Sequence, residues 1–268
     1  MDLQPVPDFP ALKMDDTLVI GDLHIGVEAH LGAKGVHLTS RTDDMFDSIV
    51  KAAGDDIYRI IVLGDVKDSV PGSTKQEYRE IPRFFDRLLE YFDQVNVVRG
   101  NHDTSIEEFL PGAVRVRPAT GMVVEDVGLV HGHTWPSERV MECRTLVMGH
   151  EHPTVLFRDG VGAHMSEPCW MRGRFAEKDE SKTPRYRKLP ESFIVVPAFN
   201  RLLGGSPVNE NGTPMLGPVL NSDLVMLDDS HIYLLDGVDL GRRGDIMVTD
   251  RQFKRWNDRE DQPRHSAL

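Results

Sequence analysis

Aspartate, asparagine and histidine residues follow apolar runs at five places in this sequence. At the first place Asp22 and His24 stand two residues apart, directly after Leu18–Ile20 and a glycine. Both side chains can bind metal ions, but a single Asp-x-His pair is common and usually marks a turn carboxylate beside a solvated histidine. The arrangement recurs at Asp65, at Asn101, His102 and Asp103, at His131 and His133, and at His150 and His152. Five clusters in one chain predict a metal centre with an acid or base beside it.

Short buried strands must position these residues. The β-branched runs Thr17–Gly21, Ile57–Leu63 and Val95–Val98 each end at a cluster, and amphipathic patterns predict helices between them, over Thr39–Gly54 and around Ile81–Phe92. Open α/β folds place their sites at the carboxyl ends of strands. We therefore expect the clusters to meet at one edge of a sheet.

The second half of the chain is richer in strands than the first. After residue 114 the sequence changes to short apolar runs with few helical patterns, and Asp159-Gly160 is a hairpin signal between Pro153–Phe157 and Val161–His164. The chain is thus predicted to be an α/β protein in which early βαβ units are followed by β-rich segments. We expect a single domain over residues 1–241, followed by a charged tail, 242–268, that is either helical or disordered.

The composition limits the classes of function. The net charge is −12, with 31 basic and 43 acidic residues among 268, so long contacts with a phosphate backbone need a local basic patch or bound cations. Two cysteines without CxxC spacing, Cys143 and Cys169, favour a reducing cytoplasm over a disulfide framework or a zinc ribbon. No apolar run approaches the roughly 18 residues of a membrane helix, so no membrane association is expected.

These clusters resemble a known signature. Asp22-Leu23-His24, Gly64-Asp65, Gly100-Asn101-His102-Asp103, His131 and Gly149-His150-Glu151-His152 reproduce, in order, the motifs of the calcineurin-like metallophosphoesterases. The run Asp22–Gly26, together with Pro197–Asn200 and Leu202–Gly205, is similar to the archaeal phosphoesterases related to the Mre11/SbcD nucleases and to the bacterial ligase-associated phosphoesterase. The resemblance implies a four-layer αββα sandwich of two mixed β-sheets flanked by helices.

The resemblance also implies a site with two divalent ions. Asp65 would bridge them, and the remaining ligands would be Asp22, His24 and His152 for one ion and Asn101, His131 and His150 for the other. His102 would act as an acid beside the ions, oriented by Asp103. A set of Asp, Asn and His without thiolates suits Mn²⁺ best, with Fe, Zn or Ni as alternatives.

A basic segment follows the last cluster. Seven basic residues and three acidic ones lie between Arg172 and Lys188, interleaved with aromatic residues, within an expected insertion at about 168–190. Such a segment can grip phosphates and stack bases, and the alternative is a solvated loop. We expect Trp170 and Arg172 to contact substrate, and His133 to contact substrate or support the ligands. Asn200, Gly204 and Gly205 lie in a loop that either packs under the site or turns the chain, and a turn is favoured.

The expected function is hydrolysis of a phosphoester by a dinuclear, metal-dependent phosphoesterase. A metal-bridging hydroxide would attack a phosphodiester of nucleic acid or of a nucleotide. The alternatives are a small-molecule phosphodiesterase or phosphomonoesterase, and an inactive scaffold of the same fold, which typically loses the pair seen here as Asn101-His102. DNA or RNA is the expected partner, with an association with DNA-repair proteins; the sequence predicts no particular oligomeric state.

Overall fold

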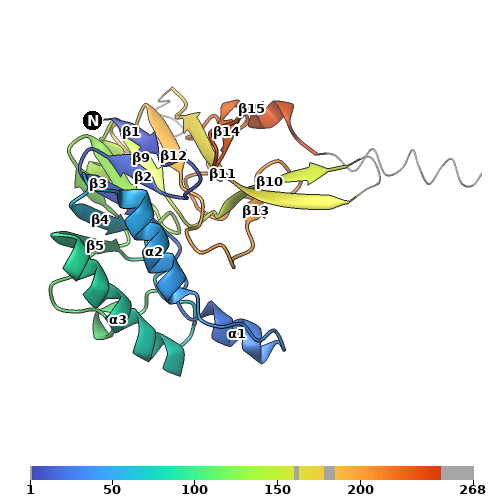
Figure 1. Cartoon of the computed structure of the whole chain (residues 1–268). Coiled ribbons are helices and arrows are strands. Elements are labelled where there is room, and N and C mark those ends of the chain that lie inside the picture. Colours follow the sequence, from blue (N-terminus) through green and yellow to red (C-terminus); the bar gives the residue numbers. More distant parts are fainter. Residues whose placement is uncertain (1, 160–162, 178–184, 249–268) are drawn as a thin grey trace, which may run out of the picture.

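The computed structural model describes residues 2–159, 163–177 and 185–248. Within these ranges two β-sheets pack face to face, and the strands of the first sheet all lie between Leu3 and Arg117 (Figure 1). Its strand order is β1-β2-β3-β4-β5-β6, with β3 to β6 parallel. Its strands are β1 (Leu3–Pro5), β2 (Leu12–Met14), β3 (Thr17–Ile20), β4 (Arg59–Val62), β5 (Gln94–Val98) and β6 (Arg115–Arg117).

The second sheet contains the later strands. Its main path is β13-β10-β11-β12-β9-β8-β7, and β14 pairs with both β11 and β15. The central strands β8, β9 and β12 run parallel to one another. Its strands are β7 (Met122–Val124), β8 (Val127–Val130), β9 (Thr145–Met148), β10 (Pro153–Arg158), β11 (His164–Arg174), β12 (Ser192–Val195), β13 (Ser206–Pro207), β14 (His231–Leu234) and β15 (Asp239–Arg242).

Helices cover the outer face of the first sheet. The apolar stripes of α2 (Thr42–Ala53) and α3 (Lys75–Tyr91) pack on that face, so that Ile49, Phe84 and Phe85 are at most 1% exposed. A capping box starts α3. The Thr74 hydroxyl accepts a hydrogen bond from the backbone N–H of Glu77, and the Glu77 carboxylate accepts one from the backbone N–H of Thr74. The short helix α1 (Val27–Ala33) follows β3 and lies apart from α2 and α3 in Figure 1.

A second core fills the space between the sheets, and a third covers the far side of the second sheet. Val19, Ile61 and Leu63 of the first sheet meet Val147 and Ile194 of the second in the middle core. The far side is covered by the four-residue helix α4 (Glu138–Met141) and by loop residues, including Val208, Met215, Val219, Leu220 and Leu224. The predicted α/β sandwich of two mixed sheets is confirmed, and its outermost layer on this side consists mainly of loops.

Three sequence-based expectations fall at the edges of this fold. Residues 168–174 of the expected insertion belong to strand β11, which pairs with β12 and β14 in the sheet, and residues 178–184 lie outside the described part of the chain. The expected tail begins inside β15, and the side chain of Arg243 is nearly buried and donates to the Val208 carbonyl. Residues 249–268 also lie outside the described ranges. Among the helices described, none is long and apolar enough to cross a membrane.

Candidate metal centre

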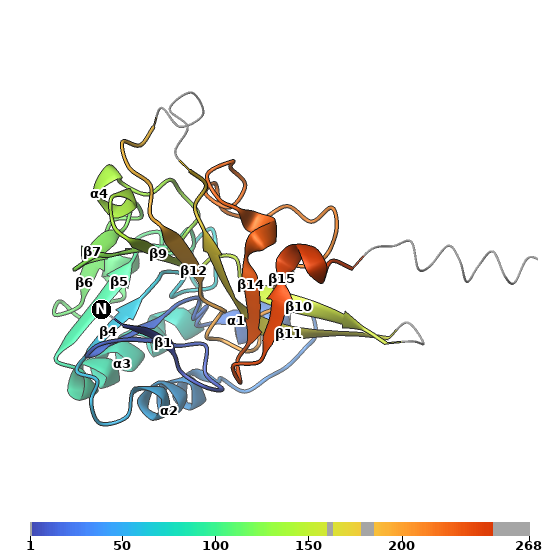
Figure 2. The same cartoon turned by 90° about the horizontal axis from the view of Figure 1, so that it is seen from above.

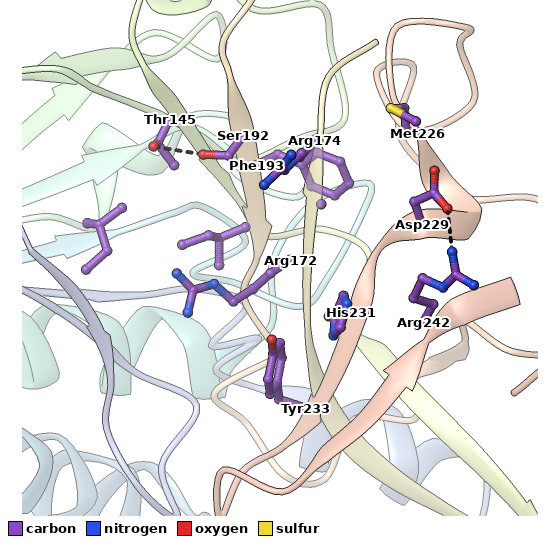
Figure 3. Close-up of a pocket in the computed structure, with 13 residues that line it drawn as sticks. Thr145, Arg172, Arg174, Ser192, Phe193, Met226, Asp229, His231, Tyr233 and Arg242 are labelled. Atoms are coloured by element: carbon purple, nitrogen blue, oxygen red, sulfur yellow. Dashed lines mark hydrogen bonds and ion pairs between the residues drawn. The ribbon is translucent and has the colours of Figure 1, made fainter. Parts of the chain in front are cut away.

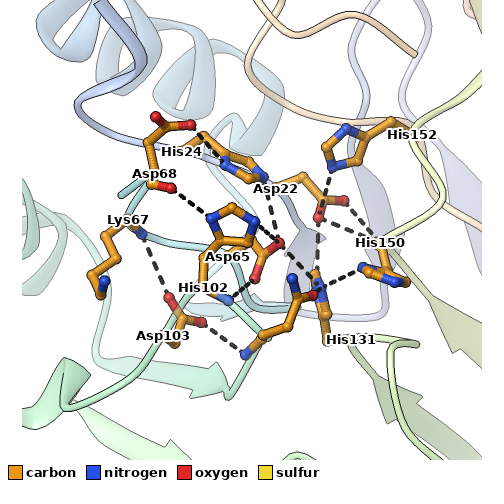
Figure 4. A network of polar contacts seen from close by, with 12 residues as sticks. Asp22, His24, Asp65, Lys67, Asp68, His102, Asp103, His131, His150 and His152 are labelled. Carbon is orange, nitrogen blue, oxygen red and sulfur yellow. Dashed lines mark hydrogen bonds and ion pairs between the residues drawn. The ribbon is translucent and has the colours of Figure 1, made fainter. Parts of the chain in front are cut away.

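The carboxyl ends of five strands meet at one edge of the sandwich. Asp22 and His24 follow β3, Asp65 follows β4, and Asn101 and His102 follow β5, and these three strands are parallel neighbours in the first sheet. His131 follows β8, and His150 and His152 follow β9, its parallel neighbour in the second sheet. Figure 4 shows that the side chains of Asp22, Asp65 and the histidines converge, and Asn101 Oδ1 lies 3.0 Å from His131 Nε2. The predicted gathering of clusters at strand ends is therefore what the structure contains.

The backbone of these loops is strained at the residues that carry the polar groups. Asp22, His24, Asp65, His150 and His152 have φ values of 58°, 40°, 49°, 69° and 46°. Residues other than glycine rarely adopt this left-handed region, at a cost of about 1–3 kcal/mol each in such sites. Hydrogen bonds between the loops, such as His24 N–H to the Asp65 carbonyl at 2.9 Å, hold them there. Strain concentrated on polar loop residues is typical of functional sites.

Glycines let the loops approach the carboxylates. A Cβ atom added to Gly100 would lie 2.1 Å from Oδ1 of Asp65 and 2.3 Å from its backbone nitrogen. A Cβ on Gly149 would lie 2.8 Å from Oδ2 of Asp22. The glycine that accompanies each of these motifs therefore has a packing reason, because any side chain there would push a carboxylate out of the site.

Four side-chain atoms surround one point beside His131. Nδ1 of this buried ring lies 2.6 Å from the Leu63 carbonyl, which can only accept, so Nδ1 donates to that carbonyl and Nε2 faces the site. Asn101 Oδ1, His150 Nδ1 and Asp65 Oδ2 lie 3.0, 3.1 and 3.3 Å from that Nε2. Ligand atoms about 2.1 Å from one ion and at right angles are separated by about 3 Å. The spacing fits a shared cation.

A second group of side chains lies on the other side of Asp65. His152 Nε2 lies 3.2 Å from Oδ1 of Asp22, and His24 Nε2 lies 3.5 Å from Oδ2 of Asp65. Within the described residues, neither Nε2 atom has a hydrogen-bond partner, although both are buried. Such orphaned atoms need an explanation, and a cation held by Asp22, His24, His152 and Asp65 supplies one.

Asp65 lies between the two groups. Its Oδ1 accepts a hydrogen bond from the backbone N–H of His102 at 2.9 Å. Its Oδ2 faces both His131 Nε2, at 3.3 Å, and His24 Nε2, at 3.5 Å. One oxygen is thus fixed by the backbone, and the other is left pointing at both candidate ion positions.

The buried carboxylates of Asp22 and Asp65 need positive charge beside them. Burial alone raises the pKa of Asp22 and Asp65, but the neighbouring histidines outweigh burial and lower both values. Burial acts to lower the pKa of His24 and His131, but hydrogen bonds and charges from the carboxylates raise these values to about 10 and about 9. In the metal-free chain imidazolium ions therefore balance the buried carboxylates, which is the charge that divalent cations would supply.

His150 and His133 are held neutral. Burial, with a contribution from His131, lowers the pKa of His150 to about 4, so its lone pair is available at neutral pH. The same causes lower the pKa of His133, whose ring centroid lies 5.2 Å from that of His131 and 6.0 Å from that of His150. His133 Nδ1 is buried without a hydrogen-bond partner in the described structure. His133 thus lies beside the group of potential ligands formed by His131, His150, Asn101 and Asp65.

His102 is oriented by Asp68 rather than by Asp103, so that expectation is wrong. Nδ1 of His102 lies 2.6 Å from the Asp68 carbonyl, while the Asp103 carboxylate accepts from the backbone N–H groups of Val66 and Gly100 at 2.8 Å. The Asp103 side chain is fully buried and ties two loops together. His102 is 29% exposed, and its Nε2 lies 4.0 Å from Oδ2 of Asp65.

The two expected substrate residues on the basic segment lie elsewhere. Trp170 is 1% exposed in the core between the sheets, so it cannot stack on a base in this structure. Arg172 pairs with Ile194 and His231 in the sheet and lines a cavity near the opposite ends of the strands. Because side chains alternate between the two faces of a strand, Trp170 and Arg172 lie on the same face of β11. The sequence did not reveal that residues 168–174 form an inner strand.

Three supporting residues were missed or only partly predicted from sequence. Asp68 also places a carboxylate oxygen 3.2 Å from His24 Nδ1, and the buried Glu77 accepts from the Asp68 and Ser69 amides. The turn favoured for Asn200 is present, because its carbonyl accepts from the Leu203 amide at 3.2 Å. Asn200 also packs beneath the loop of Asp22 and His24, because it is 5% exposed and its side-chain amide donates to the Leu23 carbonyl at 2.8 Å. The spacing Gly64-Asp65-x-x-Asp68 and the run Pro197–Asn200 were the available signals.

The chain is similar to known proteins in sequence and in fold. Residues 16–183 match the family described as calcineurin-like phosphoesterase. The fold is similar to that of the Pseudomonas putida nuclease MPE, with a TM-score of 0.51 and 18% identity over 87% of this chain and 96% of that one. The Escherichia coli phosphoesterase Yfce gives a TM-score of 0.38 and 14% identity over 84% of this chain and 97% of that one.

The comparison with curated proteins gave no match. The family match covers more than half of the chain and includes every cluster from Asp22 to His152. The chain belongs to the calcineurin-like phosphoesterase family.

Proposed function

We propose that this protein is a metal-dependent phosphodiesterase that acts on nucleic acid or nucleotides. Asp22, His24 and His152 would hold one divalent ion, Asn101, His131 and His150 would hold a second, and Asp65 would contact both. Mn²⁺ is the proposed metal, because the donors are oxygen and imidazole nitrogen without thiolate. When bound, such ions would supply Lewis acidity and would lower the pKa of a bound water.

The position of the Asp65 carboxylate carries this proposal. Its Oδ2 lies 3.3 Å from His131 Nε2 and 3.5 Å from His24 Nε2, in two different groups of potential ligands. A carboxylate that only ties loops together accepts from backbone N–H groups, as Asp103 does, and needs no histidines around it. Two sets of nitrogen and oxygen atoms around one carboxylate favour a dinuclear site.

His102 is proposed as the group that assists departure of the leaving oxygen. Its Nδ1–H donates to the Asp68 carbonyl, so the ring is fixed with Nε2 toward the site. It is also the more exposed of the histidines around Asp65, with 29% exposure against 6% for His24 and 0% for His131. A fixed ring at the solvent side can reach a bound phosphoester and donate a proton from Nε2.

The proposed substrate class rests on similarities of fold and of late sequence motifs. A protein of similar fold is described as a nuclease, and the late motifs Pro197–Asn200 and Leu202–Gly205 resemble those of the Mre11/SbcD-related and ligase-associated phosphoesterases. Association with DNA-repair proteins is part of the same proposal. A cytoplasmic location is proposed from the two buried cysteines, which are both free.

A substrate panel tests the proposal. Metal-stripped protein resupplied with Mn²⁺ would be offered bis-p-nitrophenyl phosphate, p-nitrophenyl phosphate, and single- and double-stranded DNA and RNA, with Asp65→Asn as the inactive comparison. We expect turnover of the diester and of at least one nucleic acid, and loss of both in the variant.

The other outcomes distinguish the alternatives. Turnover of the monoester alone would replace the proposal with a phosphomonoesterase, and turnover of the small diester without any nucleic acid would point to a small-molecule phosphodiesterase. Equal and negligible activity of the wild-type and His102→Ala proteins on every substrate would favour a scaffold, against the intact Asn101-His102 pair.

A further inference from the structure

A cavity of about 640 Å³ lies on the second sheet, away from the candidate metal centre (Figure 3). It is lined by Thr145 and Ser192, the first residues of β9 and β12, whereas the ligand histidine His150 follows the last residue of β9. At about 3.3 Å per residue, roughly 10 Å of strand separates the two ends of β9. None of the residues that line the cavity belongs to the candidate metal centre.

The cavity forms where the inner face of the second sheet extends past the first. Trp170, Arg172 and Arg174 alternate along β11 and so share one face, as do their cross-strand neighbours Tyr233 and His231 of β14. Trp170 is covered by the first sheet and is 1% exposed, but Arg172 and Arg174 are exposed. Leu3 of the edge strand β1 also lines the cavity. The part of the second sheet that the first sheet covers therefore ends at β1.

The charge of the cavity is positive within an acidic protein. Its lining contains the three arginines Arg172, Arg174 and Arg242 and a single carboxylate, Asp229. That carboxylate lies 3.4 Å from Arg242, which also contacts Asp245 at 3.1 Å. In the described ranges, neither Arg172 nor Arg174 forms an ion pair or a side-chain hydrogen bond. Two guanidinium groups two residues apart are thus left for an anion from outside the chain.

An aromatic surface lies beside the two arginines. The rings of His231 and Tyr233 are stacked, with centroids 6.1 Å apart and planes 25° from parallel. Arg172 and His231 are direct partners in the register of β11 and β14. Guanidinium groups bind phosphate through paired N–H donors, and aromatic side chains next to them stack on bases without reading sequence.

We propose that this cavity is a second binding site, for a nucleotide unit with its phosphate on Arg172 and Arg174 and its base against the His231 and Tyr233 rings. The unit could be a free nucleotide or one residue of a single strand, because both present the same phosphate and base. The site does not depend on the metal centre, so its failure and that of the proposed hydrolysis are measured separately.

Fluorescence anisotropy of the full-length protein tests this site. The probe is fluorescein-labelled hexathymidylate with phosphorothioate linkages, which resist hydrolysis, and the competitors are AMP, inorganic phosphate and hexaglutamate. The double variant Arg172→Gln/Arg174→Gln is compared with Arg115→Gln, which changes an exposed strand arginine of the first sheet. Circular dichroism and a thermal melt establish that each variant folds.

We expect the double variant to bind the probe at least tenfold more weakly and Arg115→Gln to bind as the wild type does. The slope of log affinity against log salt should lose about 1.4 units, the value for two phosphate contacts on a single strand. AMP should compete better than inorganic phosphate, and His231→Ala should reduce that advantage. Asp65→Asn should retain probe binding even where hydrolysis is lost.

Three results would overturn the site. They are wild-type affinity of the double variant for both probe and AMP, absence of binding by the wild type at low salt, and competition by inorganic phosphate or hexaglutamate equal to that of AMP. Competition by AMP distinguishes the two sources of the unit. AMP as strong as the probe indicates a free nucleotide, and a probe that binds far more tightly than AMP indicates a strand.

Discussion

The carbonyl oxygen of Asp68 accepts a hydrogen bond from Nδ1 of His102 at 2.6 Å. The carboxylate of the same residue lies 3.2 Å from Nδ1 of His24. One residue therefore orients two site histidines, one through its backbone and one through its side chain, and substitutions can separate the two effects.

Of the two site histidines, Asp68→Asn should affect only His24, because the backbone carbonyl that holds His102 remains. Loss of the carboxylate that orients a ligating histidine typically costs 10–100-fold in metal affinity, and we expect a change of that size for Mn²⁺. At saturating metal, kcat should stay within a few-fold of wild type. Calorimetric titration with Mn²⁺ and a metal-dependent rate curve measure the two quantities. A large fall in kcat at saturating metal would show that the Asp68 carboxylate does more than orient His24, and would contradict this separation of roles.

His102→Gln should have the opposite effect. A positioned acid or base typically contributes 10²–10⁴ in rate, so kcat for a diester with a poor alkoxide leaving group should fall by about that factor while the bound metal per chain is unchanged. The loss should be smaller for bis-p-nitrophenyl phosphate, because its nitrophenolate leaving group needs less protonation. Equal losses across leaving groups would mean that His102 does not assist departure.

Gly100→Ala should disable the site without unfolding the protein. The added Cβ would lie 2.1 Å from Oδ1 of Asp65, so the carboxylate must move away from both groups of histidines. We expect loss of metal binding and of activity. Gly112→Ala is the matched control, because nothing lies within 4 Å of its Cβ position and its φ is not positive. Retained Mn²⁺ stoichiometry in Gly100→Ala would show that the loop tolerates the methyl group.

Asn200→Ala should couple stability to the metal site. Its side chain donates to the Leu23 carbonyl and accepts from the Leu202 amide, and losing such buried hydrogen bonds costs about 1–3 kcal/mol. Asn209 is similarly buried and bonds from both ends of its amide to the backbone of Leu156 in strand β10, not to a loop that carries a candidate ligand. Asn200→Ala and Asn209→Ala should destabilise similarly in urea, but only the first should weaken Mn²⁺ binding. Equal Mn²⁺ affinities of the two variants would show that Asn200 contributes to stability and does not support the metal centre.

The metal-free protein should lose stability as the pH rises. The pKa of His24 is raised from 6.5 to about 10 and that of His131 to about 9, because contacts with carboxylates outweigh burial. A raised pKa contributes its full stabilisation below the unfolded value of 6.5, and the contribution disappears as the pH passes the folded value. In EDTA, the urea concentration at which half of the protein is unfolded should therefore decrease as the pH is raised from about 6.5 to about 10. A midpoint that rises over this range would contradict the assignment of charge to these histidines.

The strand ends and the polar residues that follow them were predictable because they depend on local pattern. Each apolar run ends at its cluster, and parallel neighbours bring the ends together. The helix predicted over Thr39–Gly54 is α2 (Thr42–Ala53), and the one predicted around Ile81–Phe92 is α3 (Lys75–Tyr91), whose polar first turn hid its start. Helix α1 was not predicted, because seven residues between glycines carry little periodic signal.

Residues whose roles depend on tertiary packing were not predictable. Asp103 is adjacent to His102 in sequence, but its carboxylate turns to the Val66 and Gly100 amides, while Asp68, 34 positions away, holds the ring. Trp170 was expected at the surface because charged residues follow it, but pairing of β11 with β12 and β14 directs it into the core. Sequence pattern gives the alternation of a strand, and only the partner sheet decides which face is covered.

The most direct test of the account is a titration of metal-stripped protein with Mn²⁺ in which bound metal and hydrolysis of bis-p-nitrophenyl phosphate are measured together, for the wild type and for Asp65→Asn. The account predicts two ions per wild-type chain, activity that rises with the second ion, and loss of both tight binding and hydrolysis in the variant. Hydrolysis by Asp65→Asn at the wild-type rate, or full activity with no metal bound, would contradict it.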